Sequence, residues 1–559
     1  MSSGRLHLPA LLLATACGAA TGCADKDLGS DDGLDLRAPR IAVSSPARGT
    51  IVGDVSTVTV TGVVTDDDDQ VASVTVNGVA AEVTATGAFT AEVPVGAGVA
   101  LLAVTATDAA GNHATDTRAV LAGPTAPIDD PVPDAVVMGI SDDTFVALGD
   151  VAAAWLTHGD LAPTLAPAGP LFEVGYSGPD DCLYARGRAG AMTVDGAAID
   201  LFTRPGGLSL GATLTDVAVT LDLEYAAACL DGDTAITAHI GRLDLQGDLD
   251  VGIEDNRIAI ALTSTNLDLA GLDVSFADIP VEVSDLVDLD TTLGPILSYA
   301  VERLLAPMIA DALGDPGAPI ELDVLGKHVT LELLPVQLDF DDDGAQVRID
   351  TRVSTEGDDG ASFVFVPNVV PGLAVEEGFV AALADDAMTQ VMASFWAAGG
   401  LRYQLPLGGG AYGSIGVLFD EVRLEGLLPP TVNAHHDDGR LQVVFGDLLA
   451  TFLAEGVPVT QVAINGAVDL AAERTEAGLR LGVGVPAVTI DVLDEVAGTN
   501  ALDAETFEAL LSFAAGRVVG MASDLVGELP LPAMDGVGSL ELQVASTDGY
   551  VLLAGDVVR

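Results

Sequence analysis

Long runs of alternating apolar and polar residues are the feature that most restricts how this chain of 559 residues can fold. In the stretch TDVAVTLDLEY, every second residue from Val217 to Tyr225 is apolar, and the residues between them are mostly Thr, Asp or Glu. Because successive side chains of a strand point to opposite faces, such runs predict antiparallel sheets with one apolar and one solvated face. The pattern recurs in GRLDLQGDLDVGI, NRIAIALTSTNLDL, KHVTLELLPVQLDF and AQVRIDTRV, and residues 341–344 (DDDG) predict a hairpin turn between the last two.

Amphipathic helices alternate with these strands. Residues 291–313 carry apolar side chains at three- and four-residue spacing, which predicts a long helix. The body also reads as an internal duplication, because residues 138–161 and 371–401 share a Phe-Val-Ala run and a helix carrying a Trp. A helix predicted for residues 503–527 precedes the C-terminal strands, as the 291–313 helix precedes its own. Each half therefore reads as helix, several strands, long helix, and one or two strands.

The N-terminus is predicted to be a bacterial export signal. An arginine, an apolar run and small residues precede Cys17, and Ala-Thr-Gly precedes Cys23, so either Cys resembles the lipidated residue of a lipobox. The signal would span residues 1–16 or 1–22, and the acidic residues 17–39 would form a tether. An ordinary cleaved signal peptide is the alternative. We expect a location in the envelope of a Gram-negative bacterium, with an outer-membrane lipid anchor, and a disulfide between the two remaining cysteines, Cys182 and Cys229.

Residues 40–123 are short Val- and Thr-rich strands separated by turn residues, which predict an all-β sandwich. The stretches VTVNGVAAEV, GAFTAEVPV and VTATDAAGN resemble bacterial Ig-like domains, and the resemblance implies a spacer or presentation module. The four acids of residues 66–69 predict a solvated loop, with weak calcium binding as the alternative. The Pro-rich residues 124–134 predict a linker.

Charge excludes several functions. The chain has 22 Lys and Arg against 83 Asp and Glu, so the clustered cations that nucleic acid requires are missing from its composition. Electrostatic docking on anionic lipid is disfavoured for the same reason. Hydrophobic residues make up 49% of the chain but aromatic residues only 4%, which suits either a large β-rich core or the lining of an apolar cavity. We expect no cofactor, with calcium as the one weak alternative.

From residue 135 onward the chain resembles the bactericidal/permeability-increasing, lipopolysaccharide-binding and cholesteryl-ester-transfer proteins of the tubular lipid-binding superfamily. The resemblance is carried by GGLSLGATLTDVAVTLDLEY, by LGPILSYAVERLLAPMIADAL with the following strands, and by LPLPAMDGVGSLELQVASTDGYVLLAGDVV. It implies an α+β body of two tandem barrel-like halves, residues 135–366 and 373–559. Each half would be a twisted antiparallel sheet wrapped on a long helix, with an elongated apolar pocket for a phospholipid or other acyl lipid.

Two details differ from that family. Relatives that bind lipopolysaccharide carry Lys and Arg at the tip of the N-terminal barrel, whereas the turns placed there, QGDLDVGIEDN, are acidic. The family's disulfide ties a strand to the region of the long helix, and neither cysteine here lies in the predicted helix. The apolar pocket therefore carries over from the resemblance, and the recognition of an anionic head group does not.

A lipid pocket requires helix and sheet faces that are apolar on the inside. The candidate lining residues of the first half lie on its two helices: Phe145, Leu148, Val151, Trp155, Ile296, Leu297, Ala300 and Leu304. Those of the second half are Phe379, Leu383, Met388, Phe507, Leu510 and Leu511. The alternative is that these residues fill an ordinary core.

Catalytic and metal motifs are weak. His435 and His436 adjoin a predicted turn, where neighbouring side chains of a strand point to opposite faces and do not share one ion. GYSGPDD lacks the spacing of a nucleophile elbow. We therefore predict no catalytic residue, no metal site and no enzymatic activity. The function predicted is lipid binding with or without lipid transfer, and the alternative is a structural or adhesive surface protein with filled barrels.

Overall fold

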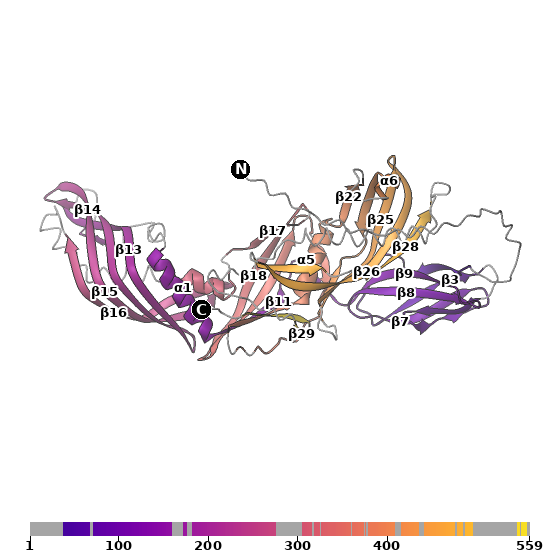
Figure 1. Ribbon diagram of the computed structural model, residues 1–559, viewed down its shortest axis with the longest axis horizontal. Helices are drawn as coiled ribbons and strands as arrows, with labels where there is room; N and C mark the ends of the chain where they lie inside the picture. Colours follow the sequence, from indigo (N-terminus) through magenta and orange to yellow (C-terminus); the bar gives the residue numbers. More distant parts are fainter. Residues whose placement is uncertain are drawn as a thin grey trace, which may run out of the picture.

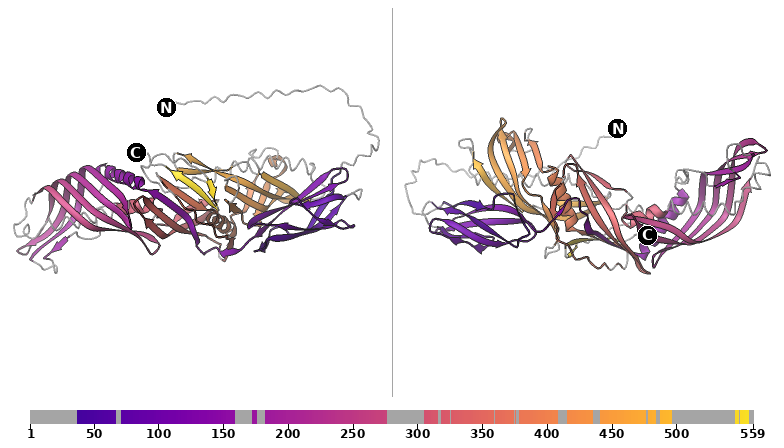
Figure 2. Two further views of the ribbon diagram at one scale, coloured as in Figure 1. Left: turned by 90° about the horizontal axis from the view of Figure 1, so that it is seen from below. Right: turned by 180° about the vertical axis from the view of Figure 1, so that it is seen from behind.

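The computed structural model describes residues 37–66, 71–158, 172–175, 182–275, 305–315, 318–324, 326–358, 360–373, 375, 378–407, 415–434, 441–475, 478–483, 487–495, 545–547 and 549–555. The molecule is long and mostly β, with a strongly curled sheet at one end, a central sheet, and a second curled sheet beside an N-terminal β-sandwich at the other end (Figures 1 and 2). The prediction of two tandem barrel-like halves of antiparallel sheet, preceded by an all-β domain, is confirmed. The body was predicted to be α+β, and its described part is mostly β with few helices.

The N-terminal domain is a sandwich of two sheets. One sheet has the order β1-β3-β7-β6 and the other β2-β9-β8-β4-β5. Their strands are β1 (Arg40–Ser45), β2 (Thr50–Gly53), β3 (Thr57–Thr65), β4 (Val71–Val76), β5 (Val79–Ala80), β6 (Glu82–Val83), β7 (Ala88–Pro94), β8 (Gly98–Asp108) and β9 (His113–Ala122). Alternate residues of β3, Val58, Val60 and Val64, are buried between the sheets while their neighbours face outward, as the alternation in sequence requires.

The first half of the body is a five-stranded antiparallel sheet of unusually long strands in the order β12-β13-β14-β15-β16. They are β12 (Phe172–Val174), β13 (Leu183–Arg204), β14 (Gly207–Ala227), β15 (Leu230–Glu254) and β16 (Arg257–Ser275). Helix α1 (Asp142–His158) packs directly against β13. The contact is so close that a Cβ at Gly149 would lie 2.4 Å from the carbonyl oxygen of Ile199, which is why glycine is needed there.

A central seven-stranded sheet connects the two halves, in the order β17-β18-β19-β11-β21-β30-β29. Its strands are β11 (Val132–Ser141), β17 (Ile320–Val324), β18 (Lys327–Phe340), β19 (Gly344–Thr355), β21 (Phe379–Ala384), β29 (Ala545–Thr547) and β30 (Tyr550–Gly555). The predicted turn at residues 341–344 joins β18 to β19. The stretch assigned to a linker contains β10 (Thr125–Pro127), which pairs with β20 (Ser362–Val364), and the start of β11.

The second half is the other curled sheet, with the order β22-β23-β25-β26-β27; β24 pairs with β25 and β28 with β26. Its elements are α5 (Asp385–Ala397), β22 (Arg402–Pro406), α6 (Ile415–Leu418), β23 (Glu421–Gly426), β24 (Thr431–Asn433), β25 (Leu441–Ala454), β26 (Val457–Thr475), β27 (Gly478–Val483) and β28 (Ala487–Glu495). Of the first predicted long helix, residues 305–312 are helical, Leu313 lies in the following turn, and residues 291–304 lie outside the described residues. The second predicted long helix, residues 503–527, lies outside them entirely.

The internal duplication has a different register from the one predicted. The shared Phe-Val-Ala run is misleading, because Phe145 lies inside helix α1 whereas Phe379 opens strand β21. The equivalent positions are the paired acids at which each helix begins, Asp142 in α1 and Asp385 in α5, each preceded by a strand of the central sheet. Acidic residues suit both places because they lie in the first turn of a helix, where backbone N–H groups are unpaired.

Candidate functional site

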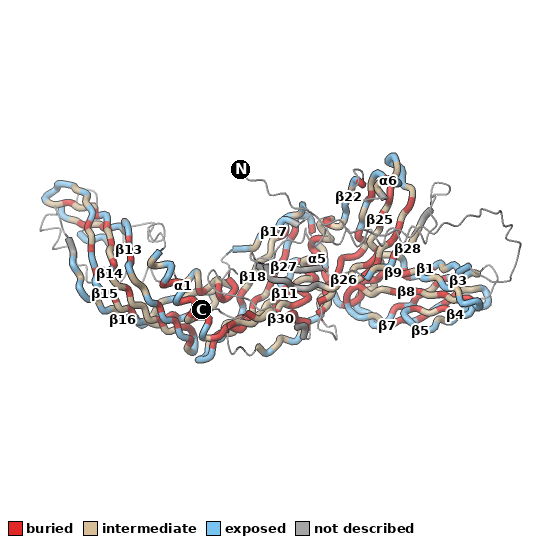
Figure 3. The backbone as a smooth tube through the Cα atoms, in the orientation of Figure 1, coloured by how far each residue is buried: buried red, intermediate tan, exposed pale blue. Residues whose placement is uncertain are grey.

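The first candidate site is the apolar face of the sheet β13–β16. Alternate residues of β13, β14 and β15 are buried on this face, which gives the regular red banding along the long strands in Figure 3. Helix α1 packs on the same face through Phe145 and Leu148, which are both buried. The most deeply buried members on the strands include Leu201, Leu208, Leu221, Leu223, Ile236, Ile240 and Leu243.

The apolar face becomes more open toward strand β16, the last strand of this sheet. Its inward residues belong to the same cluster but are only partly buried: Ile258, Ile260, Leu262, Leu267, Leu269 and Leu272. Opposing residues on β15, such as Leu245 and Leu249, are by contrast buried. A continuous apolar surface therefore runs from a filled region near α1 to a partly buried region along β16.

The predicted lining residues of the first half fall at different depths. Phe145 is fully buried, and its ring centroid lies 5.8 Å from that of Phe340 in the central sheet. Val151 is half-buried and Trp155 is 36% exposed, so the C-terminal part of α1 leaves the packed core. The predicted residues Ile296, Leu297, Ala300 and Leu304 lie outside the described residues. Their periodicity continues into Leu305, Ile309 and Leu313, which are buried in the same cluster and were not predicted as lining residues.

The predicted residues of the second half do not form one set. Phe379 packs against the cluster of the first half, and Leu383 pairs with Val136 in the central sheet. Only Met388, on α5, packs in the second half, beside Val432 and Val443. Phe507, Leu510 and Leu511 lie outside the described residues. The assignment of Phe379 to the second half follows from the misregistered duplication described above.

The second sheet has its own apolar core. Its members from β23, β25, β26 and β28 include Val422, Ala450, Phe452, Val462 and Ile490. Phe419 covers Phe452 with a ring-centroid separation of 5.0 Å. Along β28, Ile490 and Val492 contact this core, while the intervening Asp491 points to the opposite face.

The predicted disulfide is present at the far end of the first sheet, where Cys182 is bonded to Cys229. Next to it, Leu230 is 75% exposed. The resemblance placed the acidic turn between β15 and β16 at the tip of the barrel. This turn lies at the end of the strands opposite the disulfide. Beside it, Arg257 Nη1 is 2.8 Å from Asp315 Oδ1, which follows the helical residues 305–312. The disulfide and the acidic turn are far apart because they lie at opposite ends of β15, a strand of 25 residues.

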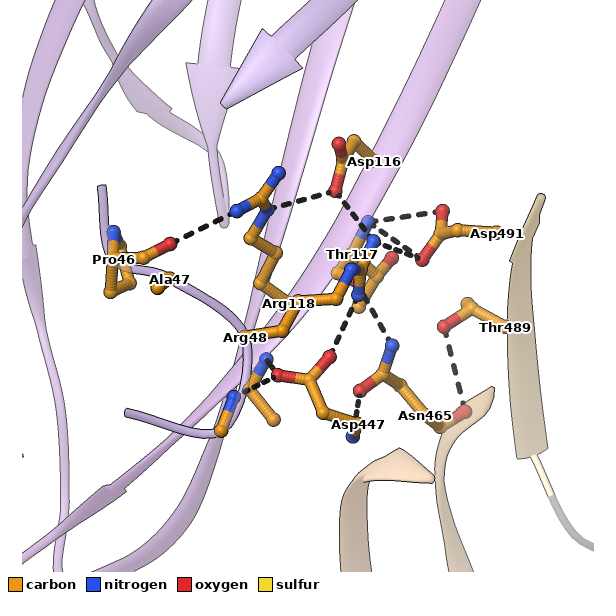
Figure 4. A network of polar contacts seen from close by, with 12 residues as sticks. Pro46, Ala47, Arg48, Asp116, Thr117, Arg118, Asp447, Asn465, Thr489 and Asp491 are labelled. Atoms are coloured by element: carbon orange, nitrogen blue, oxygen red, sulfur yellow. Dashed lines mark hydrogen bonds and ion pairs between the residues drawn. The ribbon is translucent and has the colours of Figure 1, made fainter. Parts of the chain in front are cut away.

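The second candidate site is a polar cluster between the β-sandwich and the second curled sheet, shown in Figure 4. Arg48, in the turn between β1 and β2, donates from Nη1 to Asp447 Oδ1 over 2.7 Å and to the carbonyl oxygen of Thr117 over 2.7 Å. Its Nη2 lies 3.2 Å from Asp116 and 3.5 Å from Asp491. One guanidinium thus contacts three carboxylates from three strands.

Asp447 is fully buried and saturated with donors. Its Oδ2 accepts hydrogen bonds from the backbone N–H groups of Gly49 (2.9 Å) and Ala119 (3.1 Å). It sits at a register shift of β25 with a left-handed φ of 47°, which turns its carboxylate out of the ladder toward the sandwich. Asn465 completes the contact by donating to the Thr117 carbonyl over 3.0 Å and accepting the N–H of Asp447 over 2.7 Å.

Apolar packing surrounds this polar cluster. Val99 and Ala119 of the sandwich share a buried cluster with Val364 and Leu428 of the body. A Cβ on Gly446 would lie only 2.1 Å from the Cβ of Ala119, so the two backbones are in close contact. The sandwich is therefore packed onto the outer face of the second sheet.

Metal and membrane features are limited within the described part of the chain. None of its groups of His, Cys, Asp and Glu has three members placed to hold a metal ion. Among the described helices, none combines the length and apolarity needed to cross a membrane. His435 and His436 lie outside the described residues, as do Asp67, Asp68 and Asp69 of the acidic loop.

The fold and the apolar faces define a class: an elongated tubular β protein with two curled, inwardly apolar sheets joined by a central sheet. Among solved structures, the chain is similar to lipopolysaccharide-binding protein at 12% identity, over 76% of this chain and 99% of that one, with a TM-score of 0.35. It is also similar to P47 of Clostridium botulinum E1 at 8% identity, over 77% and 100% of the two chains, with a TM-score of 0.24.

The sequence comparisons concern the N-terminal domain. The family model described as glucodextranase, domain B, matches residues 39–123. No curated protein matches the chain in sequence. The family match over residues 39–123 supports the resemblance predicted for the N-terminal domain, an Ig-like β domain.

Proposed function

We propose that the protein binds lipid acyl chains along the apolar inner faces of its curled sheets, and passes them between membranes of the cell envelope. The observation that carries this proposal is the partly buried apolar strip on β16, which continues a deeply buried apolar face. Burying an acyl chain there would contribute about 0.8 kcal/mol per methylene group, so the proposal requires no catalytic residue.

Charge favours a lipid with a zwitterionic or neutral head group. Near the disulfide end of the first sheet, Arg186 lies 3.1 Å from Glu173 and Arg188 lies 3.4 Å from Glu224. These cations are already paired, and the chain carries a formal net charge of −61. An anionic head group would therefore meet repulsion without a cation cluster to offset it.

Export and lipidation belong to the same proposal. A lipid anchor on Cys17 or Cys23 would hold the sandwich near the outer membrane of a Gram-negative cell. The sandwich and the sheet β13–β16 lie at opposite ends of the molecule (Figure 1). An anchor at one end would leave the first sheet directed away from the membrane that carries the anchor.

The test is native mass spectrometry of the full chain, before and after incubation with phosphatidylcholine vesicles and, separately, phosphatidylglycerol vesicles. We expect noncovalently bound lipid, with greater uptake of phosphatidylcholine. Ile260→Gln, on the inner side of β16, should reduce uptake severalfold, whereas Ala261→Gln, the adjacent exposed position, should leave it unchanged. A protein that carries no lipid and takes up none contradicts the proposal.

A second candidate is a structural or adhesive role with filled barrels. The specific observation in its favour is the complete burial of Leu208 and Leu221 by the protein itself. The same experiment separates the two candidates, because a filled barrel would take up no lipid and would be indifferent to Ile260→Gln.

A further inference from the structure

We propose that the contact between the β-sandwich and the second curled sheet is a proton-sensitive latch, which holds the sandwich more tightly at acidic than at alkaline pH. Its basis is a surplus of acid in a confined contact. The cluster in Figure 4 brings together three carboxylates, Asp116, Asp447 and Asp491, and two guanidinium groups, Arg48 and Arg118. With every group ionised, the contact carries one uncompensated negative charge.

The three carboxylates are not equivalent. Asp447 is fully buried and accepts three hydrogen bonds, one from Arg48 and two from the backbone N–H groups of Gly49 and Ala119. Asp116 lies 3.2 Å from Arg48 and 3.4 Å from Arg118, both part-buried. Asp491 has the weakest partner, Arg48 at 3.5 Å, and two long hydrogen bonds of 3.2 Å from the N–H of Thr117.

A proton bound at the contact would neutralise this surplus negative charge, and we place that proton on Asp491. The charged groups facing it come from each packed element: Arg48 from the turn before β2, Asp116 and Arg118 from β9, and Asp447 from β25. Burial raises the pKa of Asp491 to about 7, Arg48 and the Thr117 N–H oppose the rise, and Asp116 adds to it. Asp491 thus has both the weakest ion-pair contact of the three carboxylates and a raised pKa.

The sign of the effect follows from linkage. Undocking exposes Asp491 to water, where its pKa would return toward the ordinary value of 3.8, so the docked form binds the proton more tightly. Docking is then favoured as pH falls below about 7, and that contribution is lost as pH rises through about 7. Between pH 8.5 and 5.5 we expect a change of roughly thirtyfold in the docking equilibrium.

The test uses hydrogen–deuterium exchange of the full chain, read as protection factors corrected for the intrinsic effect of pH. The reporting peptides cover residues 46–53 and β9, because the N–H groups of Gly49, Thr117 and Ala119 donate across the contact. Protection of these peptides in the unaltered protein should fall roughly thirtyfold between pH 5.5 and 8.5. Equal protection at the two pH values overturns the proposal.

Two variants and a control identify the group responsible. Asp491→Asn should keep the acid-pH protection at both pH values. Asp350→Asn, at a partly buried carboxylate of the central sheet whose pKa is also raised, should respond to pH as the unaltered protein does. If Asp491→Asn docks poorly at both pH values, Arg118→Gln provides the alternative test. Removing this cation from the cluster favours protonation of the carboxylates, so the midpoint of the pH response must move upward. A pH response that survives Asp491→Asn, or a midpoint unmoved in Arg118→Gln, contradicts the latch.

Discussion

The guanidinium of Arg48 lies 2.7 Å from the carboxylate of Asp447, a residue 399 positions further along the chain. This ion pair joins the start of the β-sandwich to the middle strand of the second curled sheet. Because Asp447 is fully buried, its charge depends on this partner and on the two backbone N–H groups that surround it. The N-terminal domain is consequently part of the folded body.

Replacing Arg48 should release the sandwich. Arg48→Met leaves the Asp447 carboxylate buried without its cation, which should destabilise the docked state by about 3 kcal/mol. Thermal unfolding followed by calorimetry should then show a separate, earlier transition of the sandwich. The matched control is Arg352→Met, which removes an exposed ion pair with Glu332 and should change stability by less than about 1 kcal/mol. A single unchanged transition in Arg48→Met would show that the apolar contacts alone suffice.

The close approach of the two backbones gives a steric prediction. A methyl group at Gly446 would meet the Cβ of Ala119 at 2.1 Å, so Gly446→Ala should force the sandwich from the sheet at a cost of about 1–3 kcal/mol. Limited proteolysis of residues 46–53 reports the loss of contact. Gly252→Ala is the control, since a Cβ there meets nothing within 4 Å. Equal resistance of the two variants to protease would contradict the predicted contact.

Stability should also depend on pH through Asp386, at the start of α5. Burial raises its pKa to about 7, and the neighbouring charge of Asp385 adds to the rise. A raised folded-state pKa means that ionisation costs stability above about pH 7, so Asp386→Asn should stabilise the protein at pH 8.5 by about 1–3 kcal/mol. Urea unfolding should show this gain shrinking as the pH falls to 5.5, and a gain that is equal at both pH values would be inconsistent with the raised pKa.

The disulfide should stabilise the far end of the first sheet. Its cysteines are separated by 47 residues, and closing a loop of that length removes enough unfolded-chain entropy to contribute about 4 kcal/mol. Cys182→Ser with Cys229→Ser should lower the unfolding midpoint and raise hydrogen exchange in β13 and β14. Exchange in the sandwich, at the other end of the molecule, provides an internal control and should not change.

Lipidation can be assigned with two substitutions. We expect Cys17→Ser to abolish incorporation of radiolabelled palmitate and to release the protein from the membrane fraction, whereas Cys23→Ser should retain both. The opposite pattern would move the anchor to Cys23, and labelling of neither would favour an ordinary cleaved signal.

Much of the fold could be predicted because it depends on local periodicity. The strict alternation from Val217 to Tyr225 predicts one face of β14, and the DDDG turn predicts the β18–β19 hairpin; both are confirmed. The register of the duplication was wrong, since the shared Phe-Val-Ala letters occupy a helix in one half and a strand in the other. Three identical residues are weak evidence for structural equivalence when the hydrophobic periodicity of the flanking residues differs.

One of the two candidate sites could be predicted from the sequence and the other could not. Apolar alternation identified the inner face of the first sheet, because burial of one face of a strand can be read from its own residues. The latch could not be predicted, because Arg48, Asp116, Asp447 and Asp491 come from segments far apart in the sequence and each resembles an ordinary surface residue. The sequence by itself determined the long two-faced strands, the β-sandwich and the paired cysteines. Only the tertiary structure decided that the sandwich docks on the second sheet, since docking depends on backbone proximity and on charges that are distant in the chain and adjacent in space.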